Sequence, residues 1–166
     1  RGGERVRVGD MVVEAIASKH SDMITNHLVS GGIPAEVTLP MRFWDYKHGQ
    51  VLTYAIHWRG RTIYHFGSAE IVEAQLGRRR SDVVLLCMSG WKDNRGVFKR
   101  IERAIDPRVL VPMHHDDFFR PLAEGFHEGQ LAFLDGGTRA IRRAMPAASL
   151  VELDLFQEMR LRAEEK

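Results

Sequence analysis

The sequence predicts an α/β fold built on a mixed β-sheet with flanking helices. Apolar residues alternate through residues 51–67 around a central Arg-Gly pair, which is typical of a β-hairpin. Residues 83–88 are continuously apolar, as in a strand buried on both faces. An amphipathic stretch, residues 96–105, then leads to a second apolar run at 108–113. This strand–helix–strand order predicts neighbouring parallel strands.

The first fifty residues predict a hairpin followed by a long connection. Residues 4–18 contain two apolar runs around a Gly-Asp turn, and the second run leads to His20. Residues 21–50 hold paired glycines and two prolines, which interrupt any long element. A connection of this length is usually functional or carries small elements of its own.

The remaining elements follow from local signals. Gly67-Ser68 ends the central hairpin, and residues 69–76 predict a short helix. Residues 138–145 predict a second helix, and residues 149–154 predict a last strand. We expect one domain, residues 1–155, and a charged tail, residues 156–166, in the form of a frayed helix.

Composition narrows the class of protein. The 166 residues are 44% hydrophobic with a net charge of +2, which indicates a globular chain without general affinity for nucleic acid or anionic lipid. No apolar run has the roughly 18 residues of a membrane span. A single cysteine, Cys87, excludes an intrachain disulfide, so we expect a reducing, cytoplasmic setting. Because the chain starts with Arg1, a piece of a longer protein is one reading.

Polar side chains follow three of the predicted strands. His20 follows the first hairpin, Ser68 follows the second, and His114-His115-Asp116-Asp117 follows the last buried strand. Ligands of open α/β sheets bind at the carboxyl ends of strands. Imidazole and carboxylate together suit zinc, iron or manganese. The alternative, that such a histidine is only a structural hydrogen-bonding residue, stays open.

Four segments follow one another in the sequence: VVEAIASKH, TYAIHWRGRTIYHFGS, SDVVLLCMSG and DPRVLVPMHHDDF. In this order they resemble the second half of a metallo-β-lactamase-superfamily hydrolase, in the style of its lactonase-like and ribonuclease Z-like branch, and the match covers residues 4–122. The resemblance implies an αβ/βα sandwich, of which this chain covers about the C-terminal half.

The resemblance also implies roles for individual residues. His20 and His114 match positions that hold metal in that family. We expect His115 and Asp116 to act in catalysis. Other residues are expected to line the pocket or hydrogen-bond its members: Ser68, Asp117, Trp91 and Trp44.

Two departures from the family pattern limit the predicted metal site. The His-x-His-x-Asp-His motif that supplies most ligands does not occur in this sequence. The Gly-Asp pair, whose carboxylate bridges two metals in the family, is Gly67-Ser68. We therefore expect half of a site, holding one metal rather than two. Zinc is the expected metal, with manganese or iron as alternatives.

The expected activity is hydrolysis of a small-molecule ester, lactone, amide or phosphodiester by metal-activated water. One alternative is a degenerate, non-catalytic relative that acts as a binding module. Another is an RNA-processing, nuclease-like protein, supported by Arg78–Arg80 and by Arg139, Arg142 and Arg143. If half of a sandwich is missing, we expect exposed apolar surface and a homo-oligomer.

Several aromatic residues and histidines leave more than one interpretation. Met41, Phe43, Trp44 and Tyr46 either wall a substrate pocket or pack on the core. Trp91 either lines the cleft or is a core residue. We expect Phe118 and Phe119 in the core, and His48 and His127 on the surface.

Overall fold

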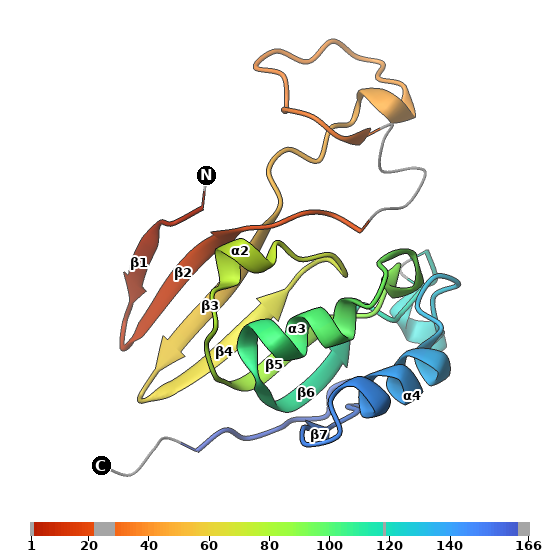
Figure 1. Cartoon of the computed structure of the whole chain (residues 1–166). Helices are drawn as coiled ribbons and strands as arrows, with labels where there is room; N and C mark the ends of the chain where they lie inside the picture. Colours follow the sequence, from red (N-terminus) through yellow and green to blue (C-terminus); the bar gives the residue numbers. More distant parts are fainter. Residues whose placement is uncertain (1, 22–28, 118, 163–166) are drawn as a thin grey trace.

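The computed structural model describes residues 2–21, 29–117 and 119–162 (Figure 1). One sheet contains seven strands in the order of the sequence. The strands are β1 (Arg5–Val8), β2 (Met11–Ala17), β3 (Leu52–Trp58), β4 (Arg61–Phe66), β5 (Ser81–Cys87), β6 (Pro107–Met113) and β7 (Ser149–Leu150). The last strand has two residues, fewer than the six that the sequence predicts.

Strand direction brings the predicted strand ends together at one side of the sheet. Strands β1 to β4 pair antiparallel, and β4 to β7 pair parallel. Strands β2, β4, β5 and β6 therefore all end at the same edge, called the carboxyl edge below. The predicted strand ends therefore share one edge, but β3 separates β2 from β4 and β5 separates β4 from β6, so they do not lie on neighbouring strands.

The helices cover one face of the sheet. Within residues 2–21, 29–117 and 119–162 they are α2 (Glu73–Leu76), α3 (Val97–Ile105) and α4 (Leu134–Ala144), with single 3-10 turns at η1 (Phe43–Asp45), η2 (Trp91–Asp93) and η3 (Leu122–Glu124). Figure 1 shows α2 and α3 lying across the sheet. The predicted apolar stripe of α3 is buried against one row of sheet side chains, which includes Ala55, Tyr64, Val84 and Leu110.

Helix α4 begins at Leu134, four residues before the predicted start. The carboxylate of Glu128 accepts the backbone N–H of Leu134 at 2.6 Å, which stabilises the start of the helix. At Gly137 a Cβ atom would lie 2.3 Å from Cε of Met88. The flexible end of Met88 can shift, but the Cβ would also lie 3.1 Å from Nε1 of Trp91, so glycine relieves crowding between α4 and the segment after β5.

The second face of the sheet carries apolar side chains that are only partly buried. A row across five strands contains Val13, Ile56, Ile63, Val83 and Val109, and all except Val83 are half-buried. The guanidinium of Arg61 donates to the carbonyl of Arg162 at 3.0 Å, so the C-terminal segment reaches the start of β4. We call this row of five side chains the open face.

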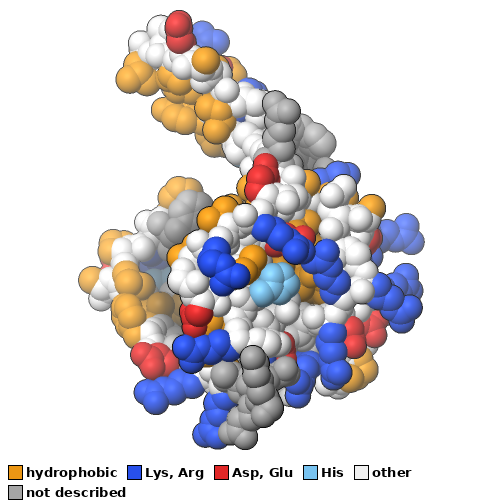
Figure 2. Space-filling model, turned by 90° about the vertical axis from the view of Figure 1, so that its left-hand side faces the viewer, with side chains coloured by type: hydrophobic (Ala, Val, Ile, Leu, Met, Phe, Trp, Pro, Cys, Tyr) orange, Lys and Arg blue, Asp and Glu red, His pale blue; other side chains and the backbone are white. Residues whose placement is uncertain are grey.

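A projecting segment, residues 29–50, extends from the carboxyl edge away from the body (Figures 1 and 2). Phe43, Trp44 and Tyr46 are exposed, so the interpretation that they pack on the core is wrong. Figure 2 shows hydrophobic side chains gathered on this segment. The guanidinium of Arg42 lies 5.7 Å from the ring centre of Trp44.

Two further predictions for the second half of the chain need correction. Phe119 is 85% exposed and is not a core residue, and Phe118 lies outside the described residues. Residues 157–162 are not helical, so the frayed helix is not found in the described part of the tail. None of the helices formed by the described residues is long and apolar enough to cross a membrane.

Candidate active site

Strand β6 ends because His114 leaves the extended conformation. Its φ angle is +53°, in the left-handed region that residues other than glycine rarely adopt and that recurs at functional sites. The following residues are held by a returning segment. The N–H of Asp117 donates to the carbonyl of His127 at 2.8 Å, and the N–H of Gly129 donates to that of His115 at 2.8 Å.

Two hollows flank the segment that follows β6. The larger has a volume of about 660 Å³ and the smaller about 400 Å³. His114, Asp116 and Asp117 line both hollows and are called the ridge below. Imidazole and carboxylate groups therefore face two neighbouring spaces at the carboxyl edge.

The larger pocket has mainly apolar walls. They come from the end of β6 and from three parts of the chain that the sequence left without a function, namely residues 122–127, Leu134 and residues 152–156. His127, expected on the surface, lines this pocket. Each wall segment is short and irregular, so only the tertiary structure brings them together.

His115 is turned into the larger pocket. Its ring centre lies 5.3 Å from that of Phe126, and its buried Nδ1 has no hydrogen-bond partner among the described residues. Burial lowers the pKa of His115, although the negative charges of Asp116 and Glu128 oppose this effect. The imidazole is therefore neutral at pH 7 and able to accept a proton.

A second cluster forms at the ends of β2 and β4. The backbone N–H of Ser21 donates to Oγ of Ser68 at 2.7 Å, and both residues are buried. The rings of His20 and His48 stack with centres 5.4 Å apart. Nε2 of His48 is buried and has no partner among the described residues. This cluster unites the predicted His20 and Ser68 with His48, which the sequence did not indicate.

The structure places His20 and His114 at different strands. Strands β3, β4 and β5 lie between β2 and β6, a separation of about 19 Å at ordinary strand spacing. The described residues contain no group of three His, Cys, Asp or Glu side chains suited to a metal ion. The metal-ligand roles of His20 and His114 stay predictions.

Three other residues, Trp91, Trp44 and Cys87, do not line either hollow. The indole of Trp91 donates to the carbonyl of Ala132 at 2.9 Å and stacks on Phe98, with ring centres 5.3 Å apart. Trp44 belongs to the projecting segment and not to the walls of the two hollows. Burial raises the pKa of Cys87 to about 11, so this thiol is a weak nucleophile.

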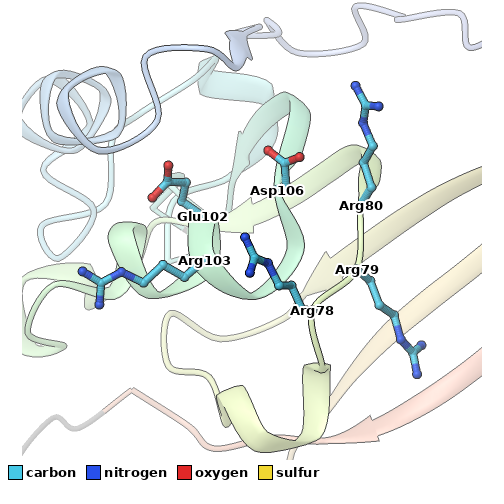
Figure 3. A pocket seen from close by; sticks show the side chains of 6 residues that line it. All are labelled: Arg78, Arg79, Arg80, Glu102, Arg103 and Asp106. Carbon is cyan, nitrogen blue, oxygen red and sulfur yellow. The ribbon is translucent and has the colours of Figure 1, made fainter.

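A basic hollow of about 580 Å³ lies at the opposite edge, where β5 starts and α3 ends (Figure 3). Its lining comprises Arg78, Arg79, Arg80, Glu102, Arg103 and Asp106. Figure 3 shows the side chain of Arg79 turned away from Arg78 and Arg103. Arg79 contacts the carboxylate of Glu14 at 3.2 Å. Arg79 therefore has a structural partner, and the other cations lie near the C-terminus of α3, where they complement the helix dipole.

The acceptor of that contact is part of a larger ion cluster. Glu14 also binds Arg5 at 2.7 Å and lies 3.6 Å from Nε2 of His57. In the view over β1 and β2, Figure 2 shows Lys and Arg side chains gathered around a histidine. Burial raises the pKa of Glu14, but the hydrogen bonds from Arg5 and Arg79 outweigh it and lower the pKa. The carboxylate thus links β1 and β2 to the segment before β5.

Comparison with known proteins gives similarity to solved structures alone. No family model matches the sequence, and no curated protein matches it. A candidate metal-dependent hydrolase from Parabacteroides distasonis matches with a TM-score of 0.50 and 12% identity over 91% of this chain and 55% of the other. A candidate Zn-dependent hydrolase of the metallo-β-lactamase superfamily from Thermotoga maritima matches at 0.41 and 14%, over 74% and 54%.

The chain thus spans about half the length of the structures that it matches. At 12% identity the likeness concerns the fold and not the activity. The predicted fold class is confirmed: this chain has a mixed α/β fold similar to that of part of the Parabacteroides distasonis structure.

Proposed function

We propose that this chain forms the C-terminal part of a metal-dependent hydrolase of the metallo-β-lactamase superfamily, acting on a small molecule. The observation that carries the proposal is the ridge of His114, Asp116 and Asp117 between two hollows. The ridge follows a parallel strand at the carboxyl edge, where α/β folds place their ligands.

The described residues do not by themselves fit a metal centre. The donor types are suitable, since imidazole and carboxylate are the usual ligands of zinc, manganese and iron in hydrolases. However, no three such groups come together among the described residues. We propose that His114 contributes to a site for one metal, preferably zinc, completed by ligands from outside the described residues. His20 lies four strand spacings away and is proposed as a ligand only within the second cluster, beside His48. We assign no catalytic step to the metal.

The chain's own residues supply binding and proton transfer. The apolar walls of the larger pocket bind the substrate. His115, kept neutral by burial, accepts a proton from the attacking water. The exposed carboxylate of Asp116 serves as a second proton acceptor on the ridge. The bond cleaved is an ester, lactone, amide or phosphodiester. All four are named because the fold alone does not select among them.

The test is metal analysis of the protein together with its natural flanking sequence. We expect about one zinc, manganese or iron ion per chain, and at least a tenfold lower content in His114→Ala. The matched control is His57→Ala, since His57 lies in β3 away from the carboxyl edge. Metal content equal to wild type in His114→Ala would remove the ligand assignment.

The second candidate function is a non-catalytic binding module. It is favoured by Ser68, which occupies the position of the bridging carboxylate and accepts a hydrogen bond from Ser21. In that case the protein with its flanking sequence would contain no metal and would still bind ligands in the larger pocket. Metal analysis therefore separates the two candidates.

An RNA-processing role has less support. Arg78–Arg80 lie at the edge opposite the ridge, and β6 alone is about 23 Å long. Arg142 is paired with Glu152 at 3.4 Å. RNA binding that weakens steeply with salt would favour this role, and absence of binding at low salt would end it.

A further inference from the structure

We infer that the larger pocket takes a ligand with an apolar chain and a neutral or cationic polar group, and disfavours anionic ligands such as phosphate esters. The inference rests on the proposed function, because it names the substrate class of the same pocket. It follows from the charges of the pocket lining and not from the fold.

The lining is acidic. It contains four carboxylates and one guanidinium: Asp116, Asp117, Glu152, Asp154 and Arg120. With neutral histidines its formal charge is −3. Arg142 approaches Glu152 from outside the lining, which reduces the charge to −2 when that residue is included. A single divalent cation on the ridge would not make the lining positive.

Arg120, the one cation of the lining among the residues that the structure describes, is already engaged. Arg120 lies 3.8 Å from Asp117 and 3.9 Å from Glu124, so its charge is shared between two carboxylates. Asp116 and Asp154 form no ion pair with a Lys or Arg among the described residues. Their negative charges therefore act on whatever enters the pocket.

The remaining walls are apolar, from Met113, Phe126, Leu134 and Leu153. A volume of about 660 Å³ is in the range of sites for small ligands and accommodates an alkyl chain of several carbons. Burial of that chain provides affinity, and the carboxylates decide which head group accompanies it.

The preference for neutral or cationic ligands disfavours phosphodiester cleavage, which is one of the reactions that the fold permits. A phosphodiester carries a negative charge, which would lie beside Asp116 or Asp154, and no Lys or Arg in the described part of the chain pairs with either carboxylate. A neutral ester, lactone or amide, or a substrate with an amine, meets no such repulsion. The charge of the pocket therefore narrows the substrate class within the proposed hydrolase activity.

The test compares how tightly the protein binds three eight-carbon probes, octylamine, octanol and octanoate, at pH 7. Chemical shifts of the His115 and His127 rings report occupancy of the pocket. We expect octylamine to bind at least about fivefold more tightly than octanoate at low salt, with octanol between them. At about 0.5 M salt the ratio should fall toward one.

The double variant Glu152→Gln/Asp154→Asn should reduce the octylamine-to-octanoate ratio at least about twofold while octanol binding is unchanged. The control is Glu158→Gln, an exposed carboxylate outside the lining. Equal or tighter binding of octanoate, or failure of all three probes to shift either ring, would overturn the inference. All titrations are run with EDTA, so the measured affinities do not depend on bound metal. A protein without a metal centre would therefore refute the proposed function and leave the measured charge preference standing.

Discussion

The backbone N–H of Ser21 donates a 2.7 Å hydrogen bond to the buried Oγ of Ser68, which joins the segment after β2 to the end of β4. This contact fixes the chain immediately after His20. It also explains how a serine is accommodated where the family resemblance leads one to expect an aspartate.

Ser68→Ala should lower the free energy of unfolding by about 1–3 kcal/mol, because the buried Ser21 N–H would lose its acceptor. Urea denaturation followed by circular dichroism measures the change. Ser149→Ala, at an exposed position of β7, is the control and should be near neutral. Equal effects of the two substitutions would show that the hydrogen bond contributes nothing to stability.

Ser68→Asp should increase the affinity of the chain for zinc at least about tenfold, because a carboxylate would join the imidazoles of His20 and His48. Competition with a chromophoric chelator measures this affinity. In the double variant Ser68→Asp/His20→Ala this gain in zinc affinity should be lost. If Ser68→Asp binds zinc no better than wild type, the site is built from other residues.

His115 should make the protein less stable as the pH falls from 7 toward 5. Burial holds the pKa of the folded-state imidazole below the value of about 6.5 for an exposed histidine. Below pH 6.5 the unfolded chain therefore binds a proton that the folded chain does not, and the unfolded state is favoured. His115→Gln should show a smaller loss of stability over this interval in urea denaturation.

An independent check is the NMR titration of the His115 ring. A midpoint below 6.5 agrees with the expected direction. A midpoint at or above that value would show that the negative charges around the pocket outweigh burial, and the imidazole would then be partly charged near neutrality.

The order of the elements is predictable because each is set by a local pattern. The alternation of residues 51–67 and the continuous apolar run of β5 determine strand type. The start of α4 is not predictable in this way, since it depends on the packing of Gly137 against Met88 and Trp91 and on Glu128 accepting the first N–H.

The candidate site is predictable only in part for the same reason. His114 follows a strand, and a strand end is visible in the sequence. The pocket walls at residues 122–127 and 152–156 come together only through the return of the chain past the ridge. The ring of His48 meets His20 across a connection whose path no local pattern determines.

Arg100 should control the acidity of Glu73 and with it the contact between α2 and α3. The hydrogen bond from Arg100 lowers the pKa of Glu73 from 4.5 to about 2. Arg100 also binds Glu70 at 2.8 Å and the carbonyl of Ile71 at 3.1 Å. In Arg100→Gln the pKa of Glu73 should rise toward 4.5, as measured by carboxyl NMR titration.

The sign of the accompanying stability change follows from the lowered pKa. The stabilisation is present above pH 4.5 and is lost as the pH falls from 4.5 toward 2. Arg100→Gln should lack this loss, whereas Arg108→Gln, whose partner is Asp82, should keep it. An unchanged Glu73 titration in Arg100→Gln would assign the low pKa to the helix start instead.

The open face should make the isolated chain self-associate. Val13, Ile56, Ile63 and Val109 form an apolar row without full cover, and this area becomes buried only through contact with another surface. Sedimentation velocity between about 10 and 200 µM should show association that increases with concentration. Ile56→Lys should shift the population toward monomer, since a lysine on the open face keeps its charged end in water.

The projecting segment is a second apolar surface that could drive self-association. A second substitution distinguishes its contribution from that of the open face. Leu39→Lys changes a side chain of the projecting segment that is 75% exposed. If Leu39→Lys and not Ile56→Lys produces monomer, the projecting segment drives association. A wild-type chain that is monomeric at every concentration and unfolds cooperatively would show that the open face needs no second surface, which would weaken the proposal that this chain is one part of a larger sandwich.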